Sequence, residues 1–103
     1  VFQTDFAVEG SSNYAFNLVL KEKDDRLMSH LMQTLKDNGV EFRRGSAGGG
    51  NQLRQPYARK LFGDEYKNYP FTNHIHFYGW DIGNYPDLEP AQIHKLTELL
   101  NAL

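Results

Sequence analysis

The chain has 103 residues, a formal net charge of −2 at pH 7 and no cysteine, which fits a single globular domain without disulfides or cysteine-based zinc sites. The small net charge argues against a dedicated nucleic-acid binder. No apolar run approaches the length of a membrane span, so we expect a soluble protein, and the absence of cysteine fits a cytoplasmic one.

The N-terminal residues 1–12 mix apolar, acidic and small side chains without a period. We predict that they form a lead-in or linker and that residues 13–103 form the domain. Because the chain starts at Val1 without methionine and stops at Leu103 inside an apolar helical pattern, we expect a piece of a longer protein.

Alternating apolar residues then predict a first strand, with one face formed by Tyr14, Phe16, Leu18 and Leu20. A helix should follow, capped by Asp24 or Asp25 and ended by Asn38 and Gly39. Its apolar positions recur with the spacing of one helix face: Leu27, Met28, Leu31, Met32 and Leu35.

Residues 40–44 predict a short second strand, with Arg44 on its apolar side at the strand end, facing a site. The glycine-rich segment 45–57 follows as a surface loop. A short helix is expected over Pro56–Phe62, with Gly63 as its stop.

The last third of the chain predicts an irregular segment over residues 64–73 and a third strand over residues 74–80, which are rich in aromatic residues. Residues 82–86 should form a turn. Glu89 and Pro90 then open a final helix with a buried stripe of Ile93, Leu96, Leu100 and Leu103.

This order, β-α-β-loop-β-α, predicts the fold class α+β. We expect a small two-layer sandwich in which an antiparallel or mixed sheet is covered on one face by two helices.

The loop is the strongest candidate for a binding site. Glycines such as Gly48, Gly49 and Gly50 let a ligand approach the backbone N–H groups, and arginine and amide side chains supply several donors. The donors are Arg44, Asn51, Arg54 and Gln55. Such a set suits a polyanion or a polyhydroxylated ligand, and the alternative is a plain connector.

His74 and His76 would share one face of the predicted strand, but no third metal ligand accompanies them, so we expect no metal site. His76 and Tyr78 are instead candidates for the edge of a binding cleft. No catalytic residue is assigned, because no nucleophile motif and no phosphate-binding glycine motif occurs.

The residues around the loop are basic, with five cations between positions 41 and 60: Arg43, Arg44, Arg54, Arg59 and Lys60. Interleaved with Phe42 and Tyr57, they could hold RNA through phosphate contacts and stacking. They equally suit the diphosphate of a nucleotide sugar.

The segments RRGSAGGGNQLRQP (residues 43–56) and IGNYPDL (residues 82–88) are the most specific in the chain. With the rest of the chain they resemble the C-terminal small domain of the DegT/DnrJ family, the vitamin-B6-dependent sugar aminotransferases and dehydratases with the aspartate-aminotransferase fold. The resemblance is strongest to the branch of 3-dehydratases that act on nucleotide-linked 4-keto-6-deoxyhexoses in deoxysugar and O-antigen biosynthesis.

The resemblance implies a pyridoxamine or pyridoxal phosphate cofactor, bound mainly by an N-terminal domain that this chain lacks, and loss of the C3 hydroxyl from the sugar. It implies a GDP-linked substrate, a homodimeric full-length enzyme and a fragment that is inactive alone. This domain would form one wall of the cleft, with substrate-binding residues Arg44, Gly48, Gly49, Gly50, Asn51, Arg54, Gln55 and His76.

Two alternatives remain open at this stage. The parent could be a 4-aminotransferase of the perosamine-synthase kind, because the cofactor residue that separates the two reactions is not in this chain. The chain could also be a stand-alone module that binds RNA or another ligand through the same basic loop.

Overall fold

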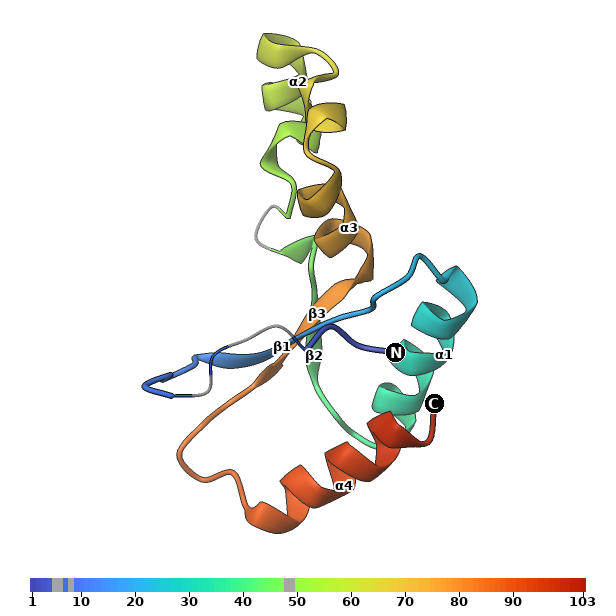
Figure 1. The fold of residues 1–103 in the computed structure, drawn as a ribbon, viewed down its shortest axis with the longest axis vertical. Helices are drawn as coiled ribbons and strands as arrows, with labels where there is room; N and C mark the ends of the chain where they lie inside the picture. The colour runs from blue at the N-terminus through green and yellow to red at the C-terminus, as the bar shows by residue number, and fades with distance from the viewer. Residues whose placement is uncertain (5–6, 8, 48–49) are drawn as a thin grey trace.

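The computed structural model describes residues 1–4, 7, 9–47 and 50–103. Its center is a three-stranded antiparallel sheet in the order β1-β3-β2, with β1 at Ala15–Val19, β2 at Phe42–Arg44 and β3 at Gly79–Gly83. Helices α1 (Asp25–Asp37) and α4 (Pro90–Asn101) pack beside it (Figure 1). This arrangement confirms the predicted small α+β sandwich with an antiparallel sheet.

The register of the strands explains why one face of the sheet is covered. Leu18 of β1 lies opposite Trp80 of β3, and Phe42 of β2 lies opposite Ile82. Since side chains alternate between the faces of a sheet, these residues share a face. They form one apolar core with Leu20, which follows β1, and with residues of both helices: Met28, Leu31, Leu35, Leu96 and Leu100.

The other face of the sheet carries a polar row across its middle. Asp81 of β3 lies between its register partners Asn17 of β1 and Arg43 of β2. Polar residues at these alternate positions are typical of a sheet that has only one covered face.

Helix α1 has the ends that its sequence predicts. The Asp24 carboxylate accepts a hydrogen bond from the Leu27 backbone N–H at 2.8 Å, which satisfies one of the free donors of the first turn. Asn38 caps the other end, and Gly39 follows with φ of 67°. The predicted helix and its buried stripe are therefore confirmed.

We expect Asp24→Ala to lower the free energy of unfolding by about 1 kcal/mol, because it removes this cap. Urea denaturation followed by circular dichroism measures the change. The control is Glu22→Ala, which removes an exposed carboxylate two residues earlier and should change the stability by less than about 0.5 kcal/mol. Equal losses in both variants would contradict the capping role.

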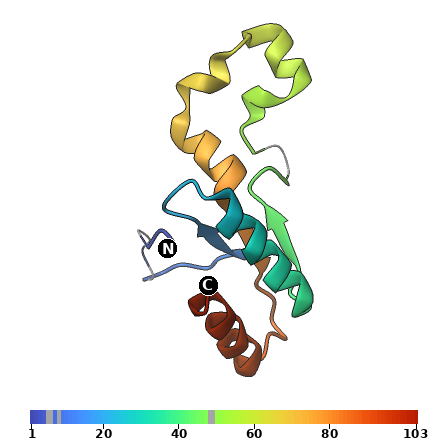
Figure 2. The ribbon, with the colours of Figure 1, turned by 90° about the vertical axis from the view of Figure 1, so that its right-hand side faces the viewer.

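Between β2 and β3 the chain leaves the sheet and forms a helical arm, described for residues 45–47 and 50–78, which projects from one end of the molecule (Figure 1). Turned by 90°, the arm is seen as two legs joined at the tip (Figure 2). It contains the 3₁₀ turn η2 (Gln52–Arg54), α2 (Pro56–Phe62), the 3₁₀ turn η3 (Glu65–Asn68) and α3 (Pro70–Tyr78). Helix α2 and its stop at Gly63 agree with the prediction.

The predicted strand over residues 74–80 is wrong for its first five residues. These belong to α3, which begins with Pro70 at its first position, and the strand starts only at Gly79. The rings of His74 and Tyr78, four residues apart, lie 5.1 Å from each other on the helix surface. The segment is helical in spite of the strand preference of its aromatic residues, because strand propensity depends strongly on context.

Two neighboring predictions also change. The segment expected to be irregular, residues 64–73, contains η3 and the first turn of α3. The expected turn begins after Gly83, because Ile82 and Gly83 complete β3.

The first residues of the chain lie along the free edge of β1. Phe2 forms a bridge with Leu20, and the Gln3 N–H donates to the Val19 carbonyl at 2.8 Å. The Phe2 ring meets the Trp80 ring edge to face, with centroids 5.7 Å apart. The sequence pattern did not predict this contact between the lead-in and the core.

In the part of the chain that the structure describes, no helix combines the length and the apolar character needed to cross a bilayer.

Candidate functional site

The center of the arm is a polar network around Asn51, the one polar side chain that is buried among the described residues, with 2% of its surface exposed. Its amide nitrogen donates to Asn73 Oδ1 at 2.8 Å, and its amide oxygen accepts from the Leu53 N–H at 3.2 Å. Asn73 in turn donates to the Tyr66 carbonyl at 2.8 Å. The network therefore joins the loop after β2 to α3 and fixes the shape of the arm.

Arg54 is held rigidly beside this network. Its Nε donates to Asn73 Oδ1 at 2.7 Å. Its guanidinium carbon lies 4.4 Å from the Tyr66 ring centroid and 4.7 Å from that of Phe77, so two aromatic rings support the cation. A guanidinium held in this way is preorganized to donate through its terminal amino groups.

His76 also contacts this network, and its side chain is a neutral imidazole. Its Nδ1 accepts a hydrogen bond from the Asn51 backbone N–H at 3.0 Å, so the ring proton is on Nε2. Burial lowers the pKa of His76 below its ordinary value of 6.5, and the positive charges of Arg54 and Arg44 lower it further. At neutral pH this ring offers a hydrogen-bond donor at Nε2.

This lowered pKa predicts a pH dependence of stability. Below about pH 6.5 the unfolded chain binds a proton at His76 that the folded chain does not yet bind. The free energy of unfolding therefore decreases as the pH is lowered from about 6.5 to the lowered pKa of the folded chain. Above that window the stabilization is complete. Thermal unfolding between pH 5 and 8 should show the loss, and it should be smaller in His76→Gln.

His94→Gln is the control for this experiment, because it removes an exposed histidine of α4. It should keep the pH dependence of the unmodified chain. An unchanged profile in His76→Gln would contradict the role of His76.

At two positions of the loop, neighboring atoms are too close to leave room for any side chain, so only glycine fits there. A side-chain carbon added at Gly45 would lie 1.9 Å from the Ile75 carbonyl oxygen, and one at Gly50 would lie 2.3 Å from His76 Nδ1. Gly50 also has φ of 51°, which favors glycine. The predicted close-approach residues Gly48 and Gly49 lie outside the described residues.

Arg44 is bound within the chain. Its Nη2 donates to the Phe77 carbonyl at 2.7 Å and its Nη1 contacts the Met32 sulfur at 3.4 Å. The residue therefore connects β2 to α3 and α1. Its predicted role in substrate binding stays a prediction.

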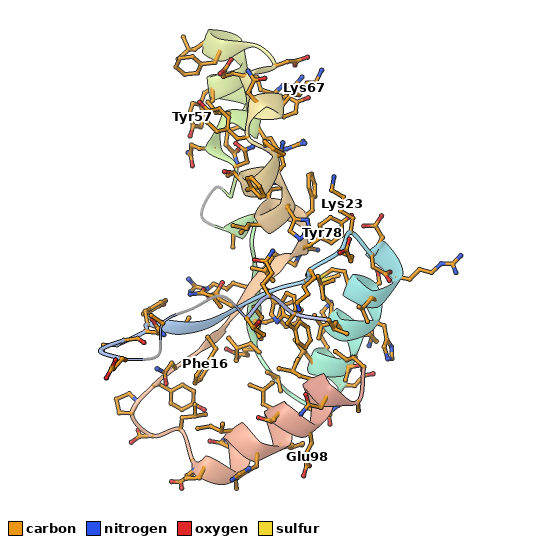
Figure 3. The ribbon with its side chains drawn as sticks, viewed as in Figure 1. Phe16, Lys23, Tyr57, Lys67, Tyr78 and Glu98 are labelled. Carbon is orange, nitrogen blue, oxygen red and sulfur yellow. The ribbon has the colours of Figure 1, made fainter. Side chains whose placement is uncertain are left out.

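The other predicted residues occupy three different places. Gln55 is the N-cap of α2. His74 Nε2 lies 2.6 Å from the Leu20 carbonyl, at the base of the arm. The Tyr78 hydroxyl donates to Asp25 at 2.9 Å, which raises the pKa of Tyr78, and Figure 3 shows this residue between the arm and the start of α1.

The structure also divides the basic stretch of the sequence. Arg43 lies on the polar face of the sheet opposite Asp81, whereas Arg44 turns toward α3. Arg54, Arg59 and Lys60 line a hollow of about 370 Å³ on the arm. A larger hollow of about 870 Å³ follows β2 and includes Arg43 and Arg44 in its lining. The five cations thus form two separate groups.

A shared metal site at the two histidines is not supported by the geometry. On a helix, residues two positions apart point about 200° away from each other, so His74 and His76 do not face one point. Among the residues that the structure describes, no group of three or more potential metal ligands comes together.

Three residues that support the site escaped the sequence analysis: Tyr66, Asn73 and Phe77. Asn73, His76 and Phe77 are spaced i, i+3, i+4, which places them on one face of a helix. Pro70 at the first position of α3 is the signal in the sequence for this helix, and the strand preference of the aromatic residues that follow obscures it.

Comparison with known proteins adds no identification. No family model matches the chain, and neither the curated proteins nor the solved structures gave a match.

Proposed function

We propose that this chain is the C-terminal domain of a vitamin-B6-dependent sugar-nucleotide 3-dehydratase. The favored substrate is GDP-4-keto-6-deoxymannose, as in the colitose pathway. The observation that supports the proposal is the convergence of Asn51, Arg54 and His76, because two of these three residues come from the segment that carries the resemblance. They lie together on an arm that extends away from the sheet (Figure 1).

The donors at this place suit a hydroxyl-rich, anionic ligand. The Arg54 guanidinium and the His76 Nε2–H are both fixed by neighboring side chains, so little side-chain entropy is lost when a ligand binds. In the proposed function these groups orient the sugar and hold it against the reactive part of the enzyme.

In the proposed enzyme the cofactor is bound mainly by the N-terminal domain, and this chain contributes to the substrate side of the cleft. Asp64, which lines the same hollow as Arg54, is already paired with Lys67 and Arg59. Donors for an anionic ligand dominate, which fits a substrate wall better than a cup for a pyridine ring. The vitamin-B6 group would act as the electron sink when bound to the N-terminal domain.

The surface of the arm also fits a docking role. Seven of the twelve large apolar side chains exposed in the described chain lie on it: Tyr57, Leu61, Phe62, Tyr69, Phe71, Ile75 and Phe77. Tyr57 and Lys67 extend from opposite sides of its tip (Figure 3). An apolar surface of this kind is typical of a segment that contacts another domain or subunit.

A titration with GDP-mannose, a stable sugar nucleotide, tests the proposal. We expect it to shift the amide resonances of Asn51, Arg54 and His76 in NMR spectra of the chain. Arg54→Gln should weaken binding about tenfold, because it removes charge-assisted hydrogen bonds. Arg26→Gln, which changes an exposed arginine of α1, should bind as the unmodified chain does.

A parallel titration with single-stranded RNA over a salt series separates the alternative of an RNA-binding module. Steep salt dependence with RNA, together with no response to GDP-mannose, would overturn the enzyme-domain proposal. The 4-aminotransferase alternative shares the same sugar-binding wall, so it predicts the same binding result.

A further inference from the structure

Strand β2 has an outer edge that no other strand covers in the part of the chain that the structure describes. The sheet order β1-β3-β2 places β2 outermost, and Figure 2 shows it as the green arrow at the margin of the molecule. The outer edge of β1 is different, because residues 1–3 run along its end and the Gln3 N–H donates to the Val19 carbonyl at 2.8 Å. The protein therefore already pairs a short extended segment with one edge of its sheet.

The register of the sheet shows which backbone groups of β2 face outward. The Gly45 N–H donates to the Gly79 carbonyl directly across from it. Since bonded and non-bonded positions alternate along an antiparallel pair, Arg43 also bonds to β3, whereas the N–H and C=O groups of Phe42 and Arg44 point away from the sheet. Within the described residues, none of these four outward groups has a hydrogen-bond partner in the protein.

The hollow of about 870 Å³ beside β2 provides room for another strand. Its lining contains all three residues of β2 and reaches both sides of the sheet. Met32 and Lys36 of α1 line it on the side of the core, and Asp81 lines it on the polar side. An added extended segment needs such an arrangement, because its side chains point alternately to the two sides.

Arg43 gives this edge a preference for charge. It lies opposite Asp81 in the register, yet among the described residues it forms no ion pair with Asp81 or any other carboxylate. An antiparallel strand added to β2 would place one side chain directly opposite Arg43, on the same face and at a non-bonded position, where side chains come closest. An acidic side chain there is attracted, and a basic one is repelled.

A second copy of this chain fits the edge poorly. The antiparallel register that bonds all four outward groups of both copies places Arg43 opposite Arg43, and like charges directly opposite each other are destabilizing. The charge of Arg43 therefore favors a partner of different sequence.

We propose that the edge of β2 binds an extended segment of a partner protein as an added antiparallel strand. An acidic residue of this segment lies opposite Arg43, and the apolar residues on either side of it lie opposite Phe42 and Arg44. These apolar side chains point to the face where Met32 lines the hollow. The inference goes beyond the proposed function, since β2 contains none of the groups proposed to orient the sugar.

NMR titration of the chain with the capped peptide acetyl-Thr-Val-Glu-Val-Thr-amide tests this proposal. The backbone amides of Phe42 and Arg44 should shift downfield and exchange more slowly with solvent, because they gain hydrogen bonds. The amide of Arg43, which is already bonded within the sheet, should change little.

Two methylated forms of the peptide test the register. A methyl group on the backbone nitrogen of the second valine should abolish binding, because this N–H donates to β2 in the proposed pairing. A methyl group on the backbone nitrogen of the glutamate should be tolerated, because that N–H points away from β2. The two peptides have the same composition and charge, so they differ only in which hydrogen bond is lost.

A charge reversal tests the role of Arg43. Arg43→Glu should weaken binding of the glutamate peptide about tenfold and should bind more tightly the peptide that has lysine in its place. The matched control is Arg26→Glu, which makes the same change at an exposed arginine of α1 and should bind both peptides as the unmodified chain does. The spectra of the variants also show whether the fold is kept.

Several outcomes would overturn the proposal. One is the absence of any shift at Phe42 and Arg44 with millimolar peptide, which would mean that Arg43 only protects the edge from pairing. Equal binding of the two methylated peptides, or of the glutamate and lysine peptides to the unmodified chain, would also contradict it. Sedimentation measures the remaining case, a dimer in which the amides of Phe42 and Arg44 are protected without peptide, because a second copy would then occupy the edge.

Discussion

Gly45→Ala should lower the free energy of unfolding by about 3 kcal/mol, at the upper end of the range for overpacking. The added carbon would lie 1.9 Å from the Ile75 carbonyl oxygen, which is backbone and cannot rotate away. The Gly45 N–H also donates to the Gly79 carbonyl at 2.6 Å. To admit the methyl group, α3 must move away from the end of β2, and this would displace the whole arm.

Thermal unfolding measures this loss, with an expected fall in Tm of about 12 to 24 °C. The control is Gly83→Ala, in which the new carbon would meet only the Tyr85 ring at 3.9 Å, an ordinary contact. Gly83→Ala should leave Tm nearly unchanged. Similar values for the two variants would show that β2 and α3 are not as close as described.

Leu35→Ala should have a comparable effect, with a loss of about 3 kcal/mol within the usual range of 2 to 5 kcal/mol. Leu35 of α1 is completely buried, with 0% of its surface exposed, and it belongs to the core cluster with Trp80 and Ile82. Truncation removes apolar contacts and leaves a cavity between the helix and the sheet.

Urea denaturation of Leu35→Ala should give a lower midpoint with an unchanged slope. Leu61→Ala is the matched control, because it is the same substitution at a residue of the arm that has 75% of its surface exposed. It should change the stability by less than about 0.5 kcal/mol. A small effect at Leu35 would mean that α1 is not firmly packed on the sheet.

The parts of the fold that the sequence predicts are those with local signals. Asp24 and Gly39 mark the ends of α1, and Pro56 and Gly63 mark those of α2. Pro90 marks the start of α4, where Glu89 and Gln92 form a capping box. These signals need no distant contact, so they can be read from a short window of residues.

Residues 74–78 show where local reasoning fails. Aromatic and β-branched residues favor strands on average, but here they form a helix whose side chains contact Leu20, Asn51 and Arg54 from distant parts of the chain. A short window contains none of these partners. The strand was therefore expected five residues too early.

The candidate site shows the same division. Residue types alone pointed to Asn51, Arg54 and His76, which the structure brings together. The residue types did not reveal that Arg44 donates to the Phe77 carbonyl, because this contact depends on how the end of β2 packs against α3. Nor did they reveal Asn73 as the shared acceptor of the site.

The contact between Phe2 and Trp80 makes the chain its own optical reporter. Trp80 is the single tryptophan of the sequence, 3% of its surface is exposed, and the Phe2 ring covers one edge of it. Detachment of the first residues would admit water to the indole and shift its fluorescence emission to longer wavelengths. The same emission band can therefore follow both the unfolding of the core and the release of the N-terminal segment, without any attached dye.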